Sequence, residues 1–187
     1  MAAGDRDRWN DKWSATAVGT SHGSALVDLL TPWLPNSGRL LDVAGGGSPA
    51  AIEFATRGLD VTVCDVSDVG LRLARNAAST AGVAITTLEA DLEAAPLPDG
   101  PFDVVTVANY LQRDLFAAMA DRLASGGLLG VIIATETNLE RNDKPGRPFL
   151  LDRDEIPGLV TGVEILHHSE DWRANGRHEA HLVGRRL

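Results

Sequence analysis

The stretch from Gly38 to Pro49 constrains the fold more than any other part of the chain. It reads Gly-Arg-Leu-Leu-Asp-Val-Ala-Gly-Gly-Gly-Ser-Pro, an apolar segment that runs directly into three glycines. Residues 40–43 predict a short buried strand, and the glycines allow a sharp turn and a close approach of the backbone to a ligand. Ser48 and Pro49 are typical of the cap and the first position of a helix. The stretch therefore predicts a strand, a tight turn and a helix N-terminus, with amide groups exposed to a nucleotide.

Strand and helix patterns alternate after this stretch. Strands are expected at 40–43, 60–64, 84–88, 102–108 and 128–134, and helices at 48–57, 67–82 and 113–124, the last ended by Gly126 and Gly127. Such alternation predicts right-handed crossovers and a parallel sheet covered on both faces. A short helix is expected near 152–156. Strands at about 163–168 and 179–185 are so close in sequence that they favour an antiparallel pair. The predicted fold class is α/β, a Rossmann-like doubly wound sheet of seven mostly parallel strands with an antiparallel C-terminal hairpin.

Length and charge limit the function classes. With 187 residues, the chain is expected to form one domain, 1–187, with an N-terminal helical lid segment at 1–37 and a nucleotide-binding core at 38–187. A formal net charge of −9 excludes a general attraction to nucleic acid or to an anionic membrane, so a small-molecule substrate is expected. The oligomeric state stays open between monomer and homodimer.

Cysteine content and the N-terminus limit the chain further. Cys64 is the only cysteine, which excludes an internal disulfide and a thiolate-rich metal site, and no metal is expected. The N-terminus has no apolar signal core, and no apolar run reaches the length of a membrane span. A cytoplasmic location is therefore expected.

Two cofactor classes compete for the glycine turn. Residues 45–50 satisfy the dinucleotide pattern G-x-G-x-x-A, and Asp65 follows Gly45 by 20 positions, as in nicotinamide- and flavin-binding proteins. Three acids indicate a different ligand, because Asp42 lies inside the first strand, Asp65 at the end of the second and Asp91 at the end of the third. One such acid could simply cap the following helix. Three of them at successive strand ends favour a common ligand.

This pattern of acids, closed by a hairpin in place of another crossover, resembles the class I S-adenosylmethionine-dependent methyltransferases over residues 39–186. In that family the first strand commonly carries D-x-G-x-G-x-G. Here residues 42–48 read Asp-Val-Ala-Gly-Gly-Gly-Ser, so Ala44 and Ser48 replace the outer glycines. The resemblance implies S-adenosylmethionine as cofactor and S-adenosylhomocysteine (SAH) as product. The alternatives are an NAD(P)-binding oxidoreductase and a non-catalytic S-adenosylmethionine-binding protein.

The resemblance also implies which residues hold the cofactor. Asp65 would accept the ribose hydroxyls, and Asp91 would accept the adenine amino group beside the backbone amide of Leu92. Asn109 and Tyr110 follow the strand at 102–108 and would lie where the methyl group emerges. The full set of expected cofactor-binding residues is Asp42, Ala44, Gly45, Gly46, Asp65, Val66, Asp91, Leu92, Asn109, Trp9 and Trp13.

On the substrate side, the chain is similar to small tellurite-resistance-type and thiol methyltransferases. The similarity rests on the opening Trp-Asn-Asp-Lys-Trp at 9–13, the stretch Leu-Asp-Val-Ala-Gly-Gly-Gly at 41–47, and the endings Arg-Pro-Phe-Leu-Leu at 147–151 and Arg-Ala-Asn-Gly-Arg-His-Glu at 173–179. It implies in-line methyl transfer to a thiol, a chalcogen oxyanion, or a hydroxyl or amine. His178 is the first candidate for a general base, because histidine titrates near neutral pH. Arg177 would attract an anionic substrate, and Tyr110 is the third catalytic candidate; a polar strand end at the surface is the plain alternative.

Trp9 and Trp13 stand four positions apart and share one face of a helix. As a lid they would cover the cofactor and contact a sulfonium by cation–π attraction. The plain alternative is a helix that packs its apolar face on the sheet. Both interpretations hold if the helix packs on the sheet at the place where it also covers the cofactor.

Overall fold

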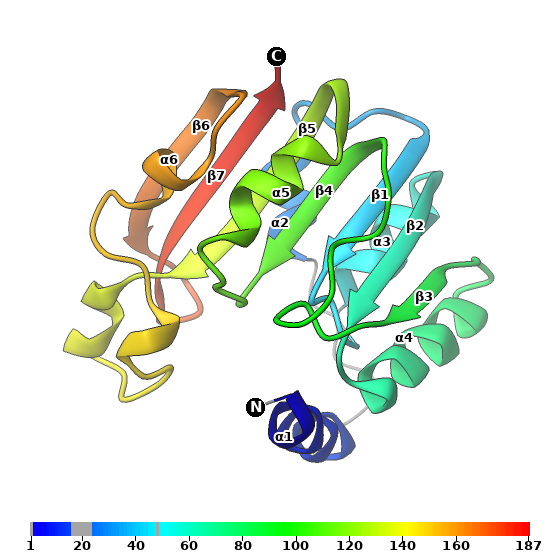
Figure 1. The fold of residues 1–187 in the computed structure, drawn as a ribbon, viewed down its shortest axis with the longest axis horizontal. Helices are drawn as coiled ribbons and strands as arrows, with labels where there is room; N and C mark the ends of the chain where they lie inside the picture. The colour runs from blue at the N-terminus through cyan, green and yellow to red at the C-terminus, as the bar shows by residue number, and fades with distance from the viewer. Residues whose placement is uncertain (1, 16–23, 48) are drawn as a thin grey trace.

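The computed structural model describes residues 2–15, 24–47 and 49–187. Seven strands form one sheet in the order β3-β2-β1-β4-β5-β7-β6 (Figure 1). The strands are β1 (Gly38–Val43), β2 (Leu59–Asp65), β3 (Thr86–Glu89), β4 (Phe102–Ala108), β5 (Leu123–Ala134), β6 (Val163–Trp172) and β7 (His178–Arg186). The helices are α1 (Ala2–Ser14), α2 (Ala25–Leu30), α3 (Pro49–Thr56), α4 (Asp68–Thr80), α5 (Leu115–Asp121) and α6 (Ile156–Leu159), with short 3₁₀ helices η1 (Glu136–Glu140) and η2 (Arg147–Phe149).

Strand pairing confirms the predicted fold class. Strands β1 to β5 pair in parallel, whereas β7 runs antiparallel to both of its neighbours, β5 and β6. The strand order reverses at β1, which pairs β2 on one side and β4 on the other. In such sheets ligands bind outside the carboxyl ends of the strands at the point of reversal.

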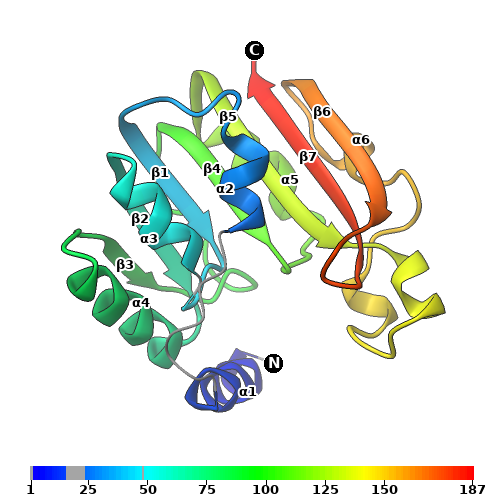
Figure 2. The same cartoon turned by 180° about the vertical axis from the view of Figure 1, so that it is seen from behind.

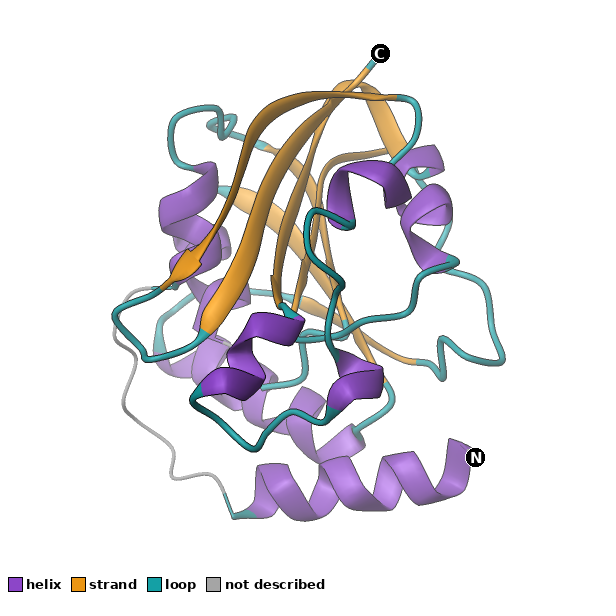
Figure 3. Cartoon of the chain, turned by 90° about the vertical axis from the view of Figure 1, so that its left-hand side faces the viewer, coloured by secondary structure: helices purple, strands orange, loops and turns teal. Residues whose placement is uncertain are grey.

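Both faces of the sheet are covered by helices (Figure 2). On one face, apolar side chains of α2, α3 and α4 pack on the sheet around the fully buried Phe54. On the other face, α5 and α6 pack around Phe116 and Ile156. Helix α1 belongs to neither layer and lies beyond the carboxyl ends of the parallel strands, as Figures 1 and 3 show. This position makes α1 a wall of any site at that edge.

The structure corrects two expectations about the second half of the chain. The helix expected at 113–124 is shorter, and β5 already begins at Leu123, because Leu123 pairs with Phe102 and the register shifts before Val104. Gly126, with a φ of 77°, therefore lies within an irregular strand and does not end the helix. The helix expected near 152–156 begins at Ile156 instead.

The capping role expected of Ser48 falls on a residue outside the described ranges. Among the described residues, every helix is too short or too polar to cross a membrane.

Candidate functional site

A cavity of about 920 Å³ opens at the carboxyl edge of the sheet, where the strand order reverses. Its volume lies at the upper end of the range of about 300–1,000 Å³ that is typical of small-molecule sites. Residues from α1, the glycine turn, the ends of β1, β2 and β4, the segment before η2 and the β6–β7 hairpin all contribute to its walls. Of the residues predicted from the sequence, the lining includes Trp9, Trp13, Asp42, Ala44, Gly45, Asp65, Val66, Asp91, Leu92, Asn109, Tyr110 and Arg177.

The glycine turn brings the backbone close to the cavity. Gly46 has a φ of 51°, and Ala44 has a φ of 53°, a left-handed conformation that alanine rarely adopts. Such a conformation costs an L-residue about 1–2 kcal/mol. Ala44 therefore takes a glycine-like backbone conformation despite its side chain. Gly45 has no room for a Cβ, which would contact the Asp42 carboxylate and the Val63 side chain.

Asp42 places a carboxyl group in the interior, with only 2% of the residue exposed. The Thr106 hydroxyl donates a hydrogen bond of 2.9 Å to its Oδ1, while its Oδ2 is buried without a hydrogen-bond partner. Burial raises the pKa of Asp42 to about 7; the Thr106 hydrogen bond opposes this rise and the neighbouring Asp65 adds to it. An unpartnered buried oxygen beside a cavity is a free acceptor for a ligand donor.

The two other strand-end acids also line the cavity. Asp65 accepts a hydrogen bond of 2.8 Å from the Ser67 amide. Burial raises its pKa, although amide donors of Ser67, Gly46 and Val66 oppose this. Asp91 accepts the amide of Glu93 at 3.0 Å. The helix that follows Asp65 is capped by Ser67, whose hydroxyl accepts the Gly70 amide at 3.0 Å. Capping is therefore done by Ser67, while the Asp65 carboxyl group lines the cavity.

Helix α1 is fixed to the glycine turn by Trp13. A Cβ built on Gly46 would lie 2.5 Å from the Trp13 ring, and one built on Gly70 would lie 2.9 Å from it. The indole thus occupies the space that these two glycines leave open. The neighbouring Asn10 docks on the start of α4, because its Oδ1 accepts the Ser67 hydroxyl at 2.6 Å and its amide donates to Asp68 at 2.8 Å. Gly46 is covered by Trp13 and is not among the cavity-lining residues.

Removing the Trp13 ring should detach α1 from the glycine turn. We expect Trp13→Ala to increase proteolytic cleavage within α1 while the melting temperature of the sheet changes little, since α1 lies outside both hydrophobic cores. Affinity for SAH should fall about fivefold or more, in line with the losses of about 1 kcal/mol or larger that are typical of deleted aromatic contacts. Limited proteolysis and calorimetric titration measure the two effects. Asp7→Ala, on an exposed position of α1, is the control; equal protection of α1 in both variants would contradict the docking role.

The end of β4 and the β6–β7 hairpin meet across the cavity. The Arg177 guanidinium donates a hydrogen bond to the side-chain oxygen of Asn109, which has a φ of 58°. The Tyr110 hydroxyl donates to Gln112 at 2.6 Å, and Gln112 in turn donates to the Leu92 carbonyl at 3.2 Å. Burial, with nearby acids, raises the pKa of Tyr110. The phenol is therefore held in its protonated form, which suits a positioning role better than that of a base.

His178, the first candidate for a general base, lies outside the cavity lining. Its Nδ1 lies 2.7 Å from the Thr135 hydroxyl, and its ring meets the Trp172 ring edge-on at 5.2 Å between centroids. His178 is not among the cavity-lining residues, whereas its neighbour Arg177 is. Successive residues of a strand point to opposite sides, so the two side chains diverge at this strand end.

Several residues of the site were not predicted from the sequence. They are Arg8, Lys12, Gln112, Lys144 and Phe149 in the cavity wall, and Asn10 and Thr106 behind it. The sequence held one signal for Arg8 and Lys12. They lie on the same predicted helix as Trp9 and Trp13, and residues three and four positions apart share a helix face.

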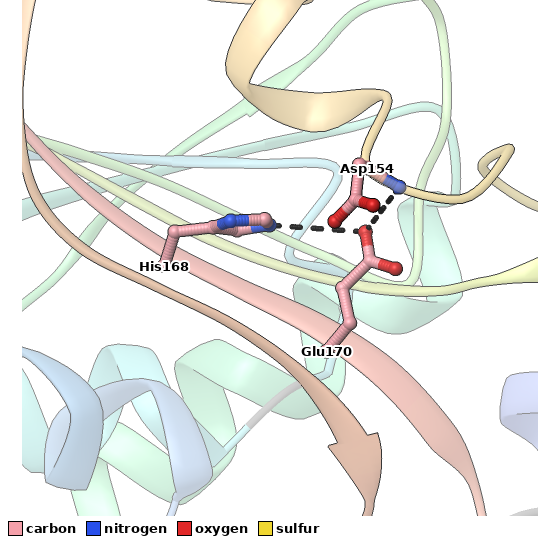
Figure 4. Close-up of side chains that lie close together, drawn as sticks. All are labelled: Asp154, His168 and Glu170. Atoms are coloured by element: carbon pink, nitrogen blue, oxygen red, sulfur yellow. Dashed lines mark hydrogen bonds and ion pairs between the residues drawn. The ribbon is translucent and has the colours of Figure 1, made fainter.

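Away from the cavity, a second cluster of polar side chains lies between β6 and the segment before α6 (Figure 4). Asp154, His168 and Glu170 have ligand-type atoms within 4.8 Å of one another, the one such group of three found in the described ranges. The Glu170 carboxylate accepts the Asp154 amide at 3.0 Å and lies 3.7 Å from His168 Nε2. These contacts tie the edge strand to the segment before α6.

Part of the core is similar to a known family of domains. Residues 40–127 match the family model described as "Methyltransferase domain". The ubiquinone/menaquinone biosynthesis C-methyltransferase UbiE of Ectopseudomonas mendocina is 34% identical over 123 residues, which cover 60% of this chain and 44% of that protein. The chain thus spans less than half the length of this curated relative.

Solved structures show the same fold at low identity. TehB from Haemophilus influenzae superposes with a TM-score of 0.72 at 19% identity, covering 97% of this chain and 67% of that one. Magnesium protoporphyrin IX methyltransferase (ChlM) from Synechocystis, with bound SAH, gives a TM-score of 0.76 at 16% identity, covering 100% and 99% of the two chains.

Proposed function

We propose that this chain transfers a methyl group from S-adenosylmethionine to a small molecule. The match of residues 40–127 to a methyltransferase-domain model and the fold shared with a solved methyltransferase support this proposal. The observation that carries the proposal is the convergence of Asp42, Asp65 and Asp91 on one cavity beside the glycine turn. The proposed acceptor is a thiol, a chalcogen oxyanion, or a hydroxyl or amine.

The residues of the cavity fit the cofactor. Asp65 and Asp91 offer carboxylate acceptors for ribose hydroxyls and for the adenine amino group, which are all donors. Asp42 Oδ2, buried and without a partner, suits a donor on the methionine portion. Leu92 and Val66 add apolar surface and backbone amides.

The cofactor supplies a methyl group already activated by a positively charged sulfur. The chain then has to align the acceptor with that carbon and to exclude water. Asn109 and Tyr110 are suited to alignment, because Arg177 and Gln112 fix their side chains by hydrogen bonds. Trp9 and Trp13 of α1 line the cavity and are suited to shielding the cofactor from solvent.

Equilibrium binding tests the cofactor assignment. We expect calorimetric titration to give micromolar affinity for SAH and no measurable binding of NAD or NADP. The dinucleotide reading of the glycine turn predicts the reverse, and that result would contradict the proposal.

Turnover tests the catalytic assignment separately. A screen of thiols, selenite, tellurite, phenols and amines should give SAH release with at least one class. Binding of SAH without turnover on any of them would favour a non-catalytic role.

A further inference from the structure

The cluster of Asp154, His168 and Glu170 lies away from the cavity, and none of its members is among the residues that line the cavity. His168 and Glu170 stand two positions apart on β6, so their side chains point to the same face of the sheet. Their partners on β7, Leu182 and Ala180, belong to the hydrophobic core on the α5 and α6 side. The segment before α6 places Asp154 beside them, although 16 positions separate Asp154 from Glu170 (Figure 4).

The His168 ring presents an unsatisfied nitrogen to this cluster. Its Nε2 atom is buried and has no hydrogen-bond partner within the part of the chain that the structure describes. Oε1 of Glu170 is 3.7 Å away, which is too long for a hydrogen bond. A buried polar atom without a partner costs free energy, and a bound ion is one way in which proteins satisfy such an atom.

The distances within the cluster suit a metal ion between the side chains. Two atoms bound to one zinc ion at tetrahedral positions lie roughly 3.3–3.6 Å apart, because each bond is about 2.0–2.2 Å long. The 3.7 Å between His168 Nε2 and Glu170 Oε1 is close to this separation, and ligand-type atoms of all three residues lie within 4.8 Å of one another. Asp154 is exposed, so rotation of its side chain can close the remaining distance.

Charge and donor type indicate the class of ion. Only 10% of the Glu170 side chain is exposed, and carboxylates buried to this degree are usually paired or bound to a metal. Within the described ranges, the ion pair of Glu170 is with His168, and Asp154 has none. The imidazole nitrogen favours zinc and related transition metals, whereas magnesium and calcium prefer oxygen ligands alone. The Asp154 amide donates to the Glu170 carboxylate at 3.0 Å, the kind of outer hydrogen bond that orients a metal ligand.

We propose that Asp154, His168 and Glu170 bind one Zn²⁺ ion, with water completing its coordination. The ion fastens the edge strand β6 to the segment before α6. The inference is independent of the proposed methyl transfer. It differs from the sequence-based expectation of no metal, since the ligands come from segments that only the folded chain brings together.

Titration of the metal-free protein with zinc chloride tests the proposal. After treatment with a chelator and its removal, calorimetry should show saturable binding of one zinc ion per chain with micromolar affinity. His168→Gln and Asp154→Asn should each weaken this binding at least tenfold, since loss of a partner outside the ligand shell already costs about 10–100-fold. Magnesium chloride should bind at least tenfold more weakly than zinc chloride. Because Asp154 is exposed, Asp154→Asn should fold even if a variant of β6 does not.

The neighbouring histidine provides a matched control. His167 is adjacent on β6, so its side chain points to the opposite face, where its Nε2 lies 3.3 Å from the Ser169 hydroxyl. His167→Gln should therefore keep the zinc affinity of the unmodified protein. Zinc at about 100 times its dissociation constant should raise the melting temperature by roughly 5–10 °C, and His168→Gln should abolish this rise.

Two results would overturn the inference. The first is the absence of saturable zinc binding by the unmodified protein, which would leave the cluster as an ion pair between His168 and Glu170. The second is a zinc affinity that both His168→Gln and Asp154→Asn leave unchanged, because zinc would then bind elsewhere. Anomalous X-ray scattering at the zinc absorption edge, measured on crystals of the zinc-loaded protein, should place the ion between the three side chains.

Discussion

Asp65→Ala should lower the affinity for SAH by about ten- to a hundredfold, because a hydrogen bond to a charged group contributes roughly 1.5–3 kcal/mol. Asp65 lines the cavity at the end of β2, and its neighbour Ser67 already caps α4. The loss should therefore appear in ligand binding and not mainly in folding. Calorimetric titration of the folded variant with SAH gives the fold-change.

The matched control for this experiment lies on the same strand. Asp60→Ala removes an exposed carboxylate from β2 at a position remote from the cavity lining and should leave SAH affinity unchanged. Circular dichroism and the melting temperature establish that both variants fold. If a folded Asp65→Ala protein bound SAH as tightly as the Asp60→Ala protein, the assignment of Asp65 to the ribose would be wrong.

Local patterns were sufficient to predict the sheet and its ligand-binding edge. Apolar runs of strand length predicted β1, β2 and β4 with bounds that agree within two residues. The carboxyl ends of parallel strands meet at one edge, so the acids at or just after the ends of β1, β2 and β3 had to converge. Alternation alone thus predicted the cavity position of Asp42, Asp65 and Asp91.

Contacts between distant parts of the chain could not be predicted from local sequence patterns. Asn10 and Ser67 are separated by 57 positions, and Asn109 and Arg177 by 68. The start of β5 depends on pairing with Phe102, which overrides the helix-ending pattern of Gly126 and Gly127. The orientation of His178 depends on the pairing of β7 with β5 and β6, since a shift of one residue would exchange its direction with that of Arg177.

The buried carboxyl of Asp42 should make the stability of the ligand-free protein depend on pH. Its pKa is raised from 3.8 to about 7 in the folded state, so the folded state holds a proton that the unfolded chain releases at lower pH. Stability from this group is therefore fully present below pH 3.8 and is lost as pH rises to about 7. A shift of this size corresponds to roughly 4 kcal/mol in the free energy of unfolding.

Asp42→Asn isolates this effect, because asparagine keeps the shape and an oxygen for the Thr106 hydrogen bond without titrating. The free energy of unfolding of the variant minus that of the unmodified protein should rise by a few kcal/mol between about pH 4 and pH 7 and then level off. Other titrating groups cancel in this difference. Urea unfolding at a series of pH values measures it.

Thr106→Val tests the pKa of Asp42 in a second way, because it should raise this pKa further and not remove the titrating group. It removes the hydrogen bond that opposes the rise in the pKa of Asp42, so the loss of stability should continue to higher pH than in the unmodified protein. The Asp42→Asn, Thr106→Val double variant should lose this pH dependence. A difference between Asp42→Asn and the unmodified protein that stays constant from pH 4 to pH 8 would show that Asp42 is ionised in its buried position, with a donor at Oδ2 that compensates for burial.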